Sequence, residues 1–185
     1  MKVELHPTAS AGDILPDAGK TLALLGALCL FLSAIEYMIP KPMPFIRLGL
    51  ANLPLVLALD LFRFRRFFLL AVIKVLGQAL VSGTLFSYIF LFSLAGTFAS
   101  AFAMYFLRRV LGRKYLSYIG ISTTGAMISN ITQLVLAYVF VFGESVRFIA
   151  PPFLAAGLIT GISLGVFCVF FTRKSRWYAL MVKTA

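Results

Sequence analysis

Lys74 is the side chain whose position most directly suggests chemistry, because it lies inside the apolar run FFLLAVIKVLGQALVSG at residues 67–83. A lysine at the centre of a membrane helix costs about 2.5–3.5 kcal/mol, so it normally faces a bundle interior or a wet cavity and has a partner. Gln78 follows four residues later and would lie on the same helix face. A cation beside an amide can orient a small ligand that carries a carboxylate, a phosphate or another electron-rich group.

Further polar residues interrupt other apolar stretches of the sequence. Glu36 lies near the end of one stretch, Asn52 at the start of the next, and Asn130 and Gln133 in the middle of a later one. We expect these groups to converge with Lys74 on one outward-opening cavity. The alternative is structural, with Lys74 paired to Glu36 or to backbone carbonyls. The predicted ligand-binding residues are Lys74, Gln78, Asn52, Glu36, Asn130, Gln133 and Arg47.

Arg47 belongs to a proline-rich stretch, IPKPMPFIRLGLANLPL, at residues 39–55. Its three alternating prolines disfavour a helix and favour extended backbone. This stretch could close over the mouth of the bundle as a lid carrying Lys41 and Arg47, or it could be a plain connector. Pro54 follows Asn52 and leaves backbone carbonyls that need other partners, which is tolerated at membrane depth where the backbone lines a cavity or is buried in protein.

The composition of the chain indicates an integral membrane protein. Of its 185 residues, 61% are hydrophobic and 12% are charged, whereas a soluble domain has roughly 45–50% and about 25%. A bilayer core needs roughly 20 mainly apolar residues per crossing helix. The sequence therefore predicts an all-α, polytopic bundle of six transmembrane helices, at about 20–39, 48–62, 66–82, 84–107, 115–142 and 149–171.

The distribution of lysine and arginine predicts the orientation of these helices. Of the 17 basic residues, 13 fall on one side of the predicted spans, three on the other, and the remaining one is Lys74. Basic loops stay cytoplasmic, so both termini should be cytoplasmic and the net charge of +11 reflects topology rather than nucleic-acid binding. We divide the chain into a tail at 1–19, a membrane bundle at 20–172 and a basic tail at 173–185.

Several kinds of chemistry are excluded by what the sequence lacks. It contains one histidine, His6, and no phosphate-binding GxxxxGK[ST] loop, so we expect neither a histidine-based metal site nor ATP hydrolysis by that route. Its six acidic residues are scattered, whereas diphosphate chemistry with Mg²⁺ needs clustered carboxylates. Asp60 is expected to pair locally with Arg63. We assign no catalytic residue, no metal and no intrinsic cofactor, and we expect no catalytic activity of this chain alone.

Ladders of small residues recur at four-residue spacing in three of the predicted spans. Such spacing lets two helices approach closely. Packing within the bundle explains most of them, although any one ladder could instead dock a partner membrane protein. The ladders are Gly157, Gly161 and Gly165; Ala95, Ala99 and Ala103; and Ala23 with Ala27.

Four stretches of the sequence carry a family resemblance over roughly residues 22–170. They are IPKPMPFIRLGLANLPLVLAL, KVLGQALVSGTLFS, FLFSLAGTFASAFAMYFLRR and IGISTTGAMISNITQLVLAYVF. The chain resembles the bacterial family called Gx transporter or heptaprenyl diphosphate synthase component I, which is grouped with substrate-binding S components of energy-coupling-factor transporters. The resemblance implies an S-component-like bundle in the bacterial cytoplasmic membrane, with a site under the external loops. It also implies a transmembrane partner subunit and two ATPases, with Ala23 and Ala27 on a candidate docking face.

Two positions depart from the pattern expected of the family. Lys74 stands where an arginine is expected, and Ser129 stands where a histidine is expected. The ligand could therefore differ from that of relatives, because lysine keeps the charge of arginine but lacks its two-pronged geometry.

Three functions remain open at this point. The chain could be an S-component-like subunit that binds a small vitamin-like or anionic ligand. It could be the membrane subunit of an electron-transfer system, with a bound quinone or flavin or a flavin-bearing redox partner. It could also be a non-catalytic subunit of heptaprenyl diphosphate synthase.

Overall fold

The computed structural model describes residues 18–39 and 49–184, and every regular element among them is a helix. This confirms the all-α prediction. The elements in chain order are α1 (Ala18–Met38), η1 (Leu50–Asn52), α2 (Leu53–Ala58), α3 (Phe64–Ser82), α4 (Tyr88–Tyr115), α5 (Tyr118–Ala137), η2 (Tyr138–Phe142), η3 (Gly143–Ser145), α6 (Val146–Lys174) and α7 (Arg176–Thr184).

Three helical stretches of the described residues are long and apolar enough to cross a membrane. They are Gly19–Met38, Tyr88–Gly112 and Tyr118–Lys174, the last of which contains both α5 and α6. Large apolar side chains such as Phe31 and Phe170 lie exposed on the outside of the bundle. These features are consistent with a membrane protein. The count of six crossings and the cytoplasmic location of the termini stay predictions.

The second predicted span, at 48–62, differs most from the structure. Its helical part covers only 50–58, as a short 3₁₀ turn followed by the six residues of α2. At about 1.5 Å per residue this part reaches roughly 14 Å, about half of a bilayer core. Pro54 lies in the first turn of α2, where its missing N–H costs no helical hydrogen bond. All six residues of α2 are buried, so this apolar segment is a central element of the bundle.

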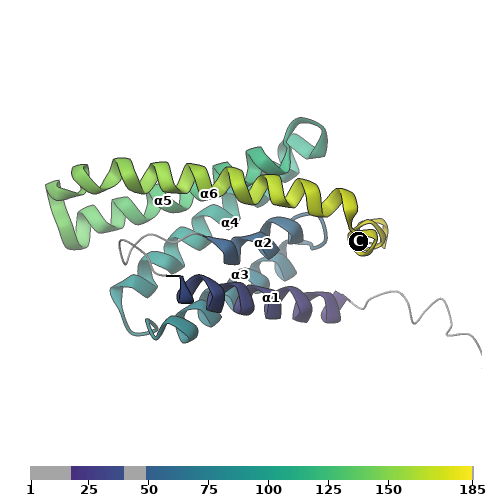
Figure 1. Cartoon of the computed structure of the whole chain (residues 1–185), viewed down its shortest axis with the longest axis horizontal. Coiled ribbons are helices and arrows are strands. Elements are labelled where there is room, and N and C mark those ends of the chain that lie inside the picture. Colours follow the sequence, from purple (N-terminus) through teal and green to yellow (C-terminus); the bar gives the residue numbers. More distant parts are fainter. Residues whose placement is uncertain (1–17, 40–48, 185) are drawn as a thin grey trace, which may run out of the picture.

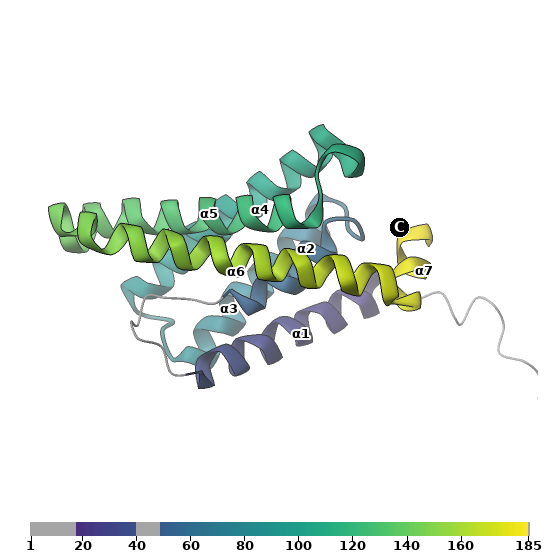
Figure 2. The ribbon, with the colours of Figure 1, turned by 45° about the horizontal axis from the view of Figure 1, so that its top comes forward.

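The helices pack around α2 in two groups. The α5 helix packs against both α4 and α6, α1 pairs with α3, and α3 also contacts α4. Figure 1 shows α2 between α6 above and α1 below, and Figure 2 shows the α1 and α3 pair below the long α5 and α6 helices. The start of α1 and the C-terminal α7 lie at the same end of the bundle (Figure 1).

The glycine ladder of α6 is an internal packing surface against α5. A Cβ added to Gly165 would meet the backbone of Ile119, and one added to Gly161 would lie 2.9 Å from the backbone of Thr123. A Cβ at Gly157 would meet the side chain of Asn130. The structure thus places this ladder inside the bundle, as expected for most such ladders, and the close approach brings α6 next to the polar face of α5.

A buried ion pair connects the chain just after α2 with α4. Arg108 donates from Nε to Oδ1 of Asp60 at 2.9 Å and from Nη2 to Oδ2 at 2.7 Å, and both side chains are 7% exposed. Tyr118 also donates to Oδ2 of Asp60 at 2.6 Å, and its hydroxyl lies 3.0 Å from that of Tyr178. The local partner expected from the sequence was Arg63. That expectation assumed a continuous helix, whereas α2 ends at residue 58 and Arg63 is extended.

We predict that Gly165→Ala lowers the free energy of unfolding by about 1–3 kcal/mol, the usual cost of overpacking a closely packed core. The added methyl group would meet backbone atoms of α5, which cannot move aside as a side chain can. The measurement is thermal unfolding in detergent followed by circular dichroism. Gly120→Ala is the matched control, because its Cβ would first meet the flexible Leu116 side chain at 3.3 Å. Equal melting temperatures for the two variants would contradict the assignment of the ladder.

We predict that Arg108→Ala lowers the free energy of unfolding by about 3–5 kcal/mol, because it removes the two-pronged ion pair that Arg108 makes with the buried carboxylate of Asp60. Arg109→Ala is the control, since Arg109 is exposed and contacts only the ring and hydroxyl of Tyr105 among its described partners; its effect should stay within about 0.5 kcal/mol. Adding Asp60→Asn to Arg108→Ala should restore part of the loss. A melting temperature unchanged by Arg108→Ala would refute the role of this pair.

Candidate functional site

A small polar cavity lies between α3, α4, α5, α6 and the segment at 49–52. Its volume is about 40 Å³. Five of the seven side chains predicted to bind a ligand line it: Lys74, Gln78, Asn52, Asn130 and Gln133. The other lining residues are Gly49, Ala51, Ser93, Thr97, Ala126, Ser129, Gly157, Thr160 and Leu164. The predicted convergence of these five side chains is therefore present in the structure, while ligand binding itself stays a proposal.

Lys74 is buried in the wall that α3 forms, with 5% of its surface exposed. Its ammonium group donates a hydrogen bond of 2.8 Å to Oγ1 of Thr97, a buried residue of α4. Gln78 lies one turn further along α3 and is 8% exposed. The four-residue spacing read from the sequence thus places a cation and an amide together on the cavity side of α3.

The polar residues of α5 are fixed by short hydrogen bonds. Asn130 donates from Nδ2 to the carbonyl oxygen of Phe153 at 3.0 Å, across the contact that Gly157 opens between α5 and α6. Gln133 donates from Nε2 to Oγ of Ser129 at 3.1 Å. Ser129 also lines the cavity, so the departure from the expected histidine falls within the candidate site.

Glu36 and Arg47 do not extend the described lining of this cavity. Glu36 is 1% exposed and is not a lining residue; its Oε1 accepts a hydrogen bond of 3.1 Å from the backbone N–H of Gly49. The carboxylate therefore positions the segment at 49–52, which forms one wall. Gly49 has a φ of 71°, a left-handed conformation that favours glycine. Arg47 and Lys41 lie outside the described residues.

Two amide oxygens of the cavity are buried without a hydrogen-bond partner among the described residues. They are Oε1 of Gln78 and Oδ1 of Asn52. An unsatisfied buried acceptor costs about 1–3 kcal/mol, so a native protein normally supplies a donor from a ligand or from water. The cavity thus offers one cationic donor and two acceptors to a small group that can both accept and donate hydrogen bonds.

Sequence reasoning missed the contribution of α4. Ser93 and Thr97 are buried lining residues spaced four apart, so they share one helix face. Their four-residue spacing indicates a shared polar face. Serine and threonine are nevertheless common in membrane helices, where their hydroxyls often donate hydrogen bonds to the backbone of their own helix. Thr160 of α6 was missed for the same reason, and its hydroxyl does donate to the carbonyl oxygen of Gly157 at 3.2 Å.

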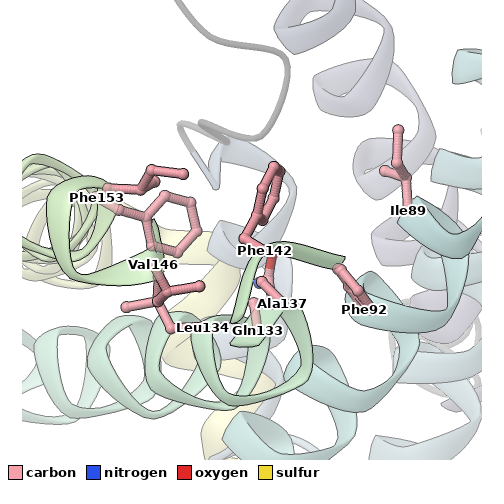
Figure 3. Close-up of a pocket in the computed structure, with 9 residues that line it drawn as sticks. Ile89, Phe92, Gln133, Leu134, Ala137, Phe142, Val146 and Phe153 are labelled. Atoms are coloured by element: carbon pink, nitrogen blue, oxygen red, sulfur yellow. The ribbon is translucent and has the colours of Figure 1, made fainter. Parts of the chain in front are cut away.

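A second small pocket lies beside the polar cavity and is mostly apolar. Figure 3 shows Phe92 of α4, Phe142 of η2 and Phe153 of α6 around it, with Gln133 at its base. Gln133 lines both spaces. The pocket therefore adjoins the polar cavity at Gln133.

The remaining predictions concern metal binding and partner docking. In the part of the chain that the structure describes, no three histidine, cysteine, aspartate or glutamate side chains gather closely enough to hold a metal ion. Ala23 and Ala27 lie on α1 and are exposed, and they do not line the polar cavity. Their face is accessible for a partner, which stays a prediction.

Comparison with known proteins identifies the family of this chain. No curated protein and no solved structure matched the sequence. The model of one protein family, described as heptaprenyl diphosphate synthase component I, matches residues 25–171, which include the polar cavity and nearly all of the helical bundle. The protein therefore belongs to the heptaprenyl diphosphate synthase component I family.

Proposed function

We propose that this chain is a ligand-binding membrane subunit that holds a small anionic or otherwise electron-rich group at Lys74. The observation that carries the proposal is the convergence of five polar side chains, from α3, α5 and the segment at 49–52, on one cavity with a buried lysine. A desolvated cation binds an electron-rich group more strongly than an exposed one, because little water competes for it. The buried amides would orient that group.

The transporter form of this proposal is an S-component-like subunit. The sequence lacks the phosphate-binding loop of common ATPases, so a separate ATPase module would supply energy. The exposed alanine face of α1, with Ala23 and Ala27, is the proposed surface for a transmembrane partner. In this form the cavity would open to the outside of the bacterial cytoplasmic membrane, and both termini would lie in the cytoplasm.

The family description favours a second candidate, a non-catalytic subunit of heptaprenyl diphosphate synthase. The carboxylates of the described residues do not cluster, so Mg²⁺-assisted prenyl transfer would need acidic residues from another chain. Here too, Lys74 and its cavity would bind rather than transform a ligand. The electron-transfer alternative, with a quinone or flavin, stays a prediction that no observation on the structure favours.

We predict that Lys74→Met reduces the amount of small molecule retained after gentle detergent purification by about ten- to a hundredfold. That range corresponds to losing a hydrogen bond to a charged group, about 1.5–3 kcal/mol. The measurement is mass spectrometry of the extracted ligand per mole of protein. Lys20→Met is the matched control, because Lys20 is exposed at the start of α1. Thermal unfolding confirms that each variant is folded, and undiminished retention by a folded Lys74→Met bundle would reject the proposal.

A further inference from the structure

The polar cavity adjoins a much larger apolar groove between α1, α2 and α6. The groove has a volume of about 600 Å³, within the range of roughly 300–1,000 Å³ typical of ligand pockets. Thr160 and Leu164 line both spaces, so the groove and the cavity adjoin at this part of α6. The groove is lined by Leu28, Leu32, Leu50, Leu53, Leu57, Thr160, Ser163, Leu164, Phe167 and Phe171.

The groove offers almost no hydrogen-bonding group to an occupant. Among the described residues that line it, the polar side chains are Thr160 and Ser163. Thr160 donates to the carbonyl oxygen of Gly157 at 3.2 Å, and Ser163 donates to that of Ile159 at 2.8 Å. Both hydroxyls are thus bound to their own helix, and the remaining leucine and phenylalanine side chains suit a hydrocarbon chain.

The groove is about as long as the hydrocarbon tail of a lipid in one membrane leaflet. Along α6 it extends from Thr160 to Phe171, which is about 16 Å at the rise of an α-helix. This is about half of a bilayer core of roughly 30 Å. Residues of α1 and α6 line the two sides of the groove, and α2 lies between these helices (Figure 1). In this arrangement a hydrocarbon tail could enter laterally from the membrane.

The chemistry of the polar cavity restricts the head group attached to such a chain. A volume of about 40 Å³ accommodates about three water-sized groups. The head must accept a hydrogen bond from Lys74 and donate to the unsatisfied oxygens of Gln78 and Asn52. Among the described lining residues a diphosphate would meet a single lysine, two amide oxygens that repel its own oxygens, and no carboxylate to share a Mg²⁺ ion, so this lining fits a diphosphate poorly.

We propose that this protein binds a lipid with a single hydrocarbon tail. The small hydrogen-bonding head of the lipid lies in the polar cavity, and its tail lies in the groove. This inference rests on the proposed binding role of the Lys74 cavity and adds the class of ligand. The groove contributes affinity through apolar burial. The cavity contributes selection of the head group, because a head that left its donors and acceptors unpaired would be rejected.

Two isoprenoid alcohols test the two halves of the proposal separately. Geraniol and geranylgeraniol carry the same hydroxyl head, which can accept a hydrogen bond from Lys74 and donate one to either of the two amide oxygens, but geranylgeraniol has a hydrocarbon chain twice as long. Binding to the detergent-purified chain is measured by native mass spectrometry over a range of alcohol concentrations. All variants are compared in the same detergent, so the partitioning of each alcohol into micelles is the same for every variant, and the test rests on how the ratio of the two affinities changes between variants.

The test uses one variant for the cavity, one for the groove and a control for the groove. Ser163→Trp fills the groove from an exposed position on α6, and Ile162→Trp places the same bulk beside it on a side chain that does not line the groove. We expect the wild type to bind geranylgeraniol at least about tenfold more tightly than geraniol. Ser163→Trp should reduce that ratio to about threefold or less with geraniol binding retained, and Ile162→Trp should leave it unchanged. Lys74→Met should weaken both alcohols by about tenfold.

The contrary outcomes distinguish this inference from the proposed function. If a folded Ser163→Trp variant keeps the full preference for geranylgeraniol, the hydrocarbon tail does not occupy the groove. The inference then fails, while the Lys74 site stands. If Lys74→Met binds geraniol as well as the wild type does, the proposed function fails. Should Ser163→Trp not fold, Leu28→Trp fills the same groove from α1 and repeats the test.

Discussion

The structure depends on burying a short helix whose two ends lie inside the bundle. Helix ends leave N–H and C=O groups without intrahelical partners, and in a membrane protein no water is at hand to satisfy them. At the start of the 50–58 segment, Glu36 accepts from the N–H of Gly49 and the thiol of Cys29 lies 3.6 Å from the carbonyl oxygen of Ala51. At its end, the hydroxyl of Tyr178 donates to the carbonyl oxygen of Leu57 at 3.2 Å. Side chains of α1 and α7 therefore hold this segment in place.

This constraint explains why polar side chains gather at both ends of α2. Beyond its start, the segment at 49–52 forms one wall of the cavity that contains Lys74. Beyond its end, the chain turns and brings the carboxylate of Asp60 to Arg108. The break in the second predicted span thus lies between the polar cavity at one end and the buried ion pair at the other.

Sequence reasoning predicted the features that depend on local spacing and missed those that depend on distant contacts. Hydropathy predicted the all-α class, and four-residue spacing placed Lys74 and Gln78 on one face. The same hydropathy predicted 48–62 as a full span, because an apolar composition is common to a lipid-facing helix and a wholly buried one. The partner of Asp60 lies 48 residues away on α4, and no local pattern indicates it. The apolar groove could not be predicted from the sequence for a similar reason, because leucine and phenylalanine occur both in grooves and on lipid-facing surfaces.

The position of Glu36 shows how a buried carboxylate can belong to a site without facing a ligand. The sequence grouped Glu36 with Lys74 as a ligand-binding residue, and the structure places it behind the cavity wall, against the backbone of Gly49. Its Oε1 accepts a hydrogen bond from the backbone N–H of Gly49, three residues before Asn52, which is one of the two amides with an unsatisfied oxygen. Glu36 thus positions the wall without lining the cavity, so the geometry of this site is shared between the groups that line it and the capped helix end that holds them.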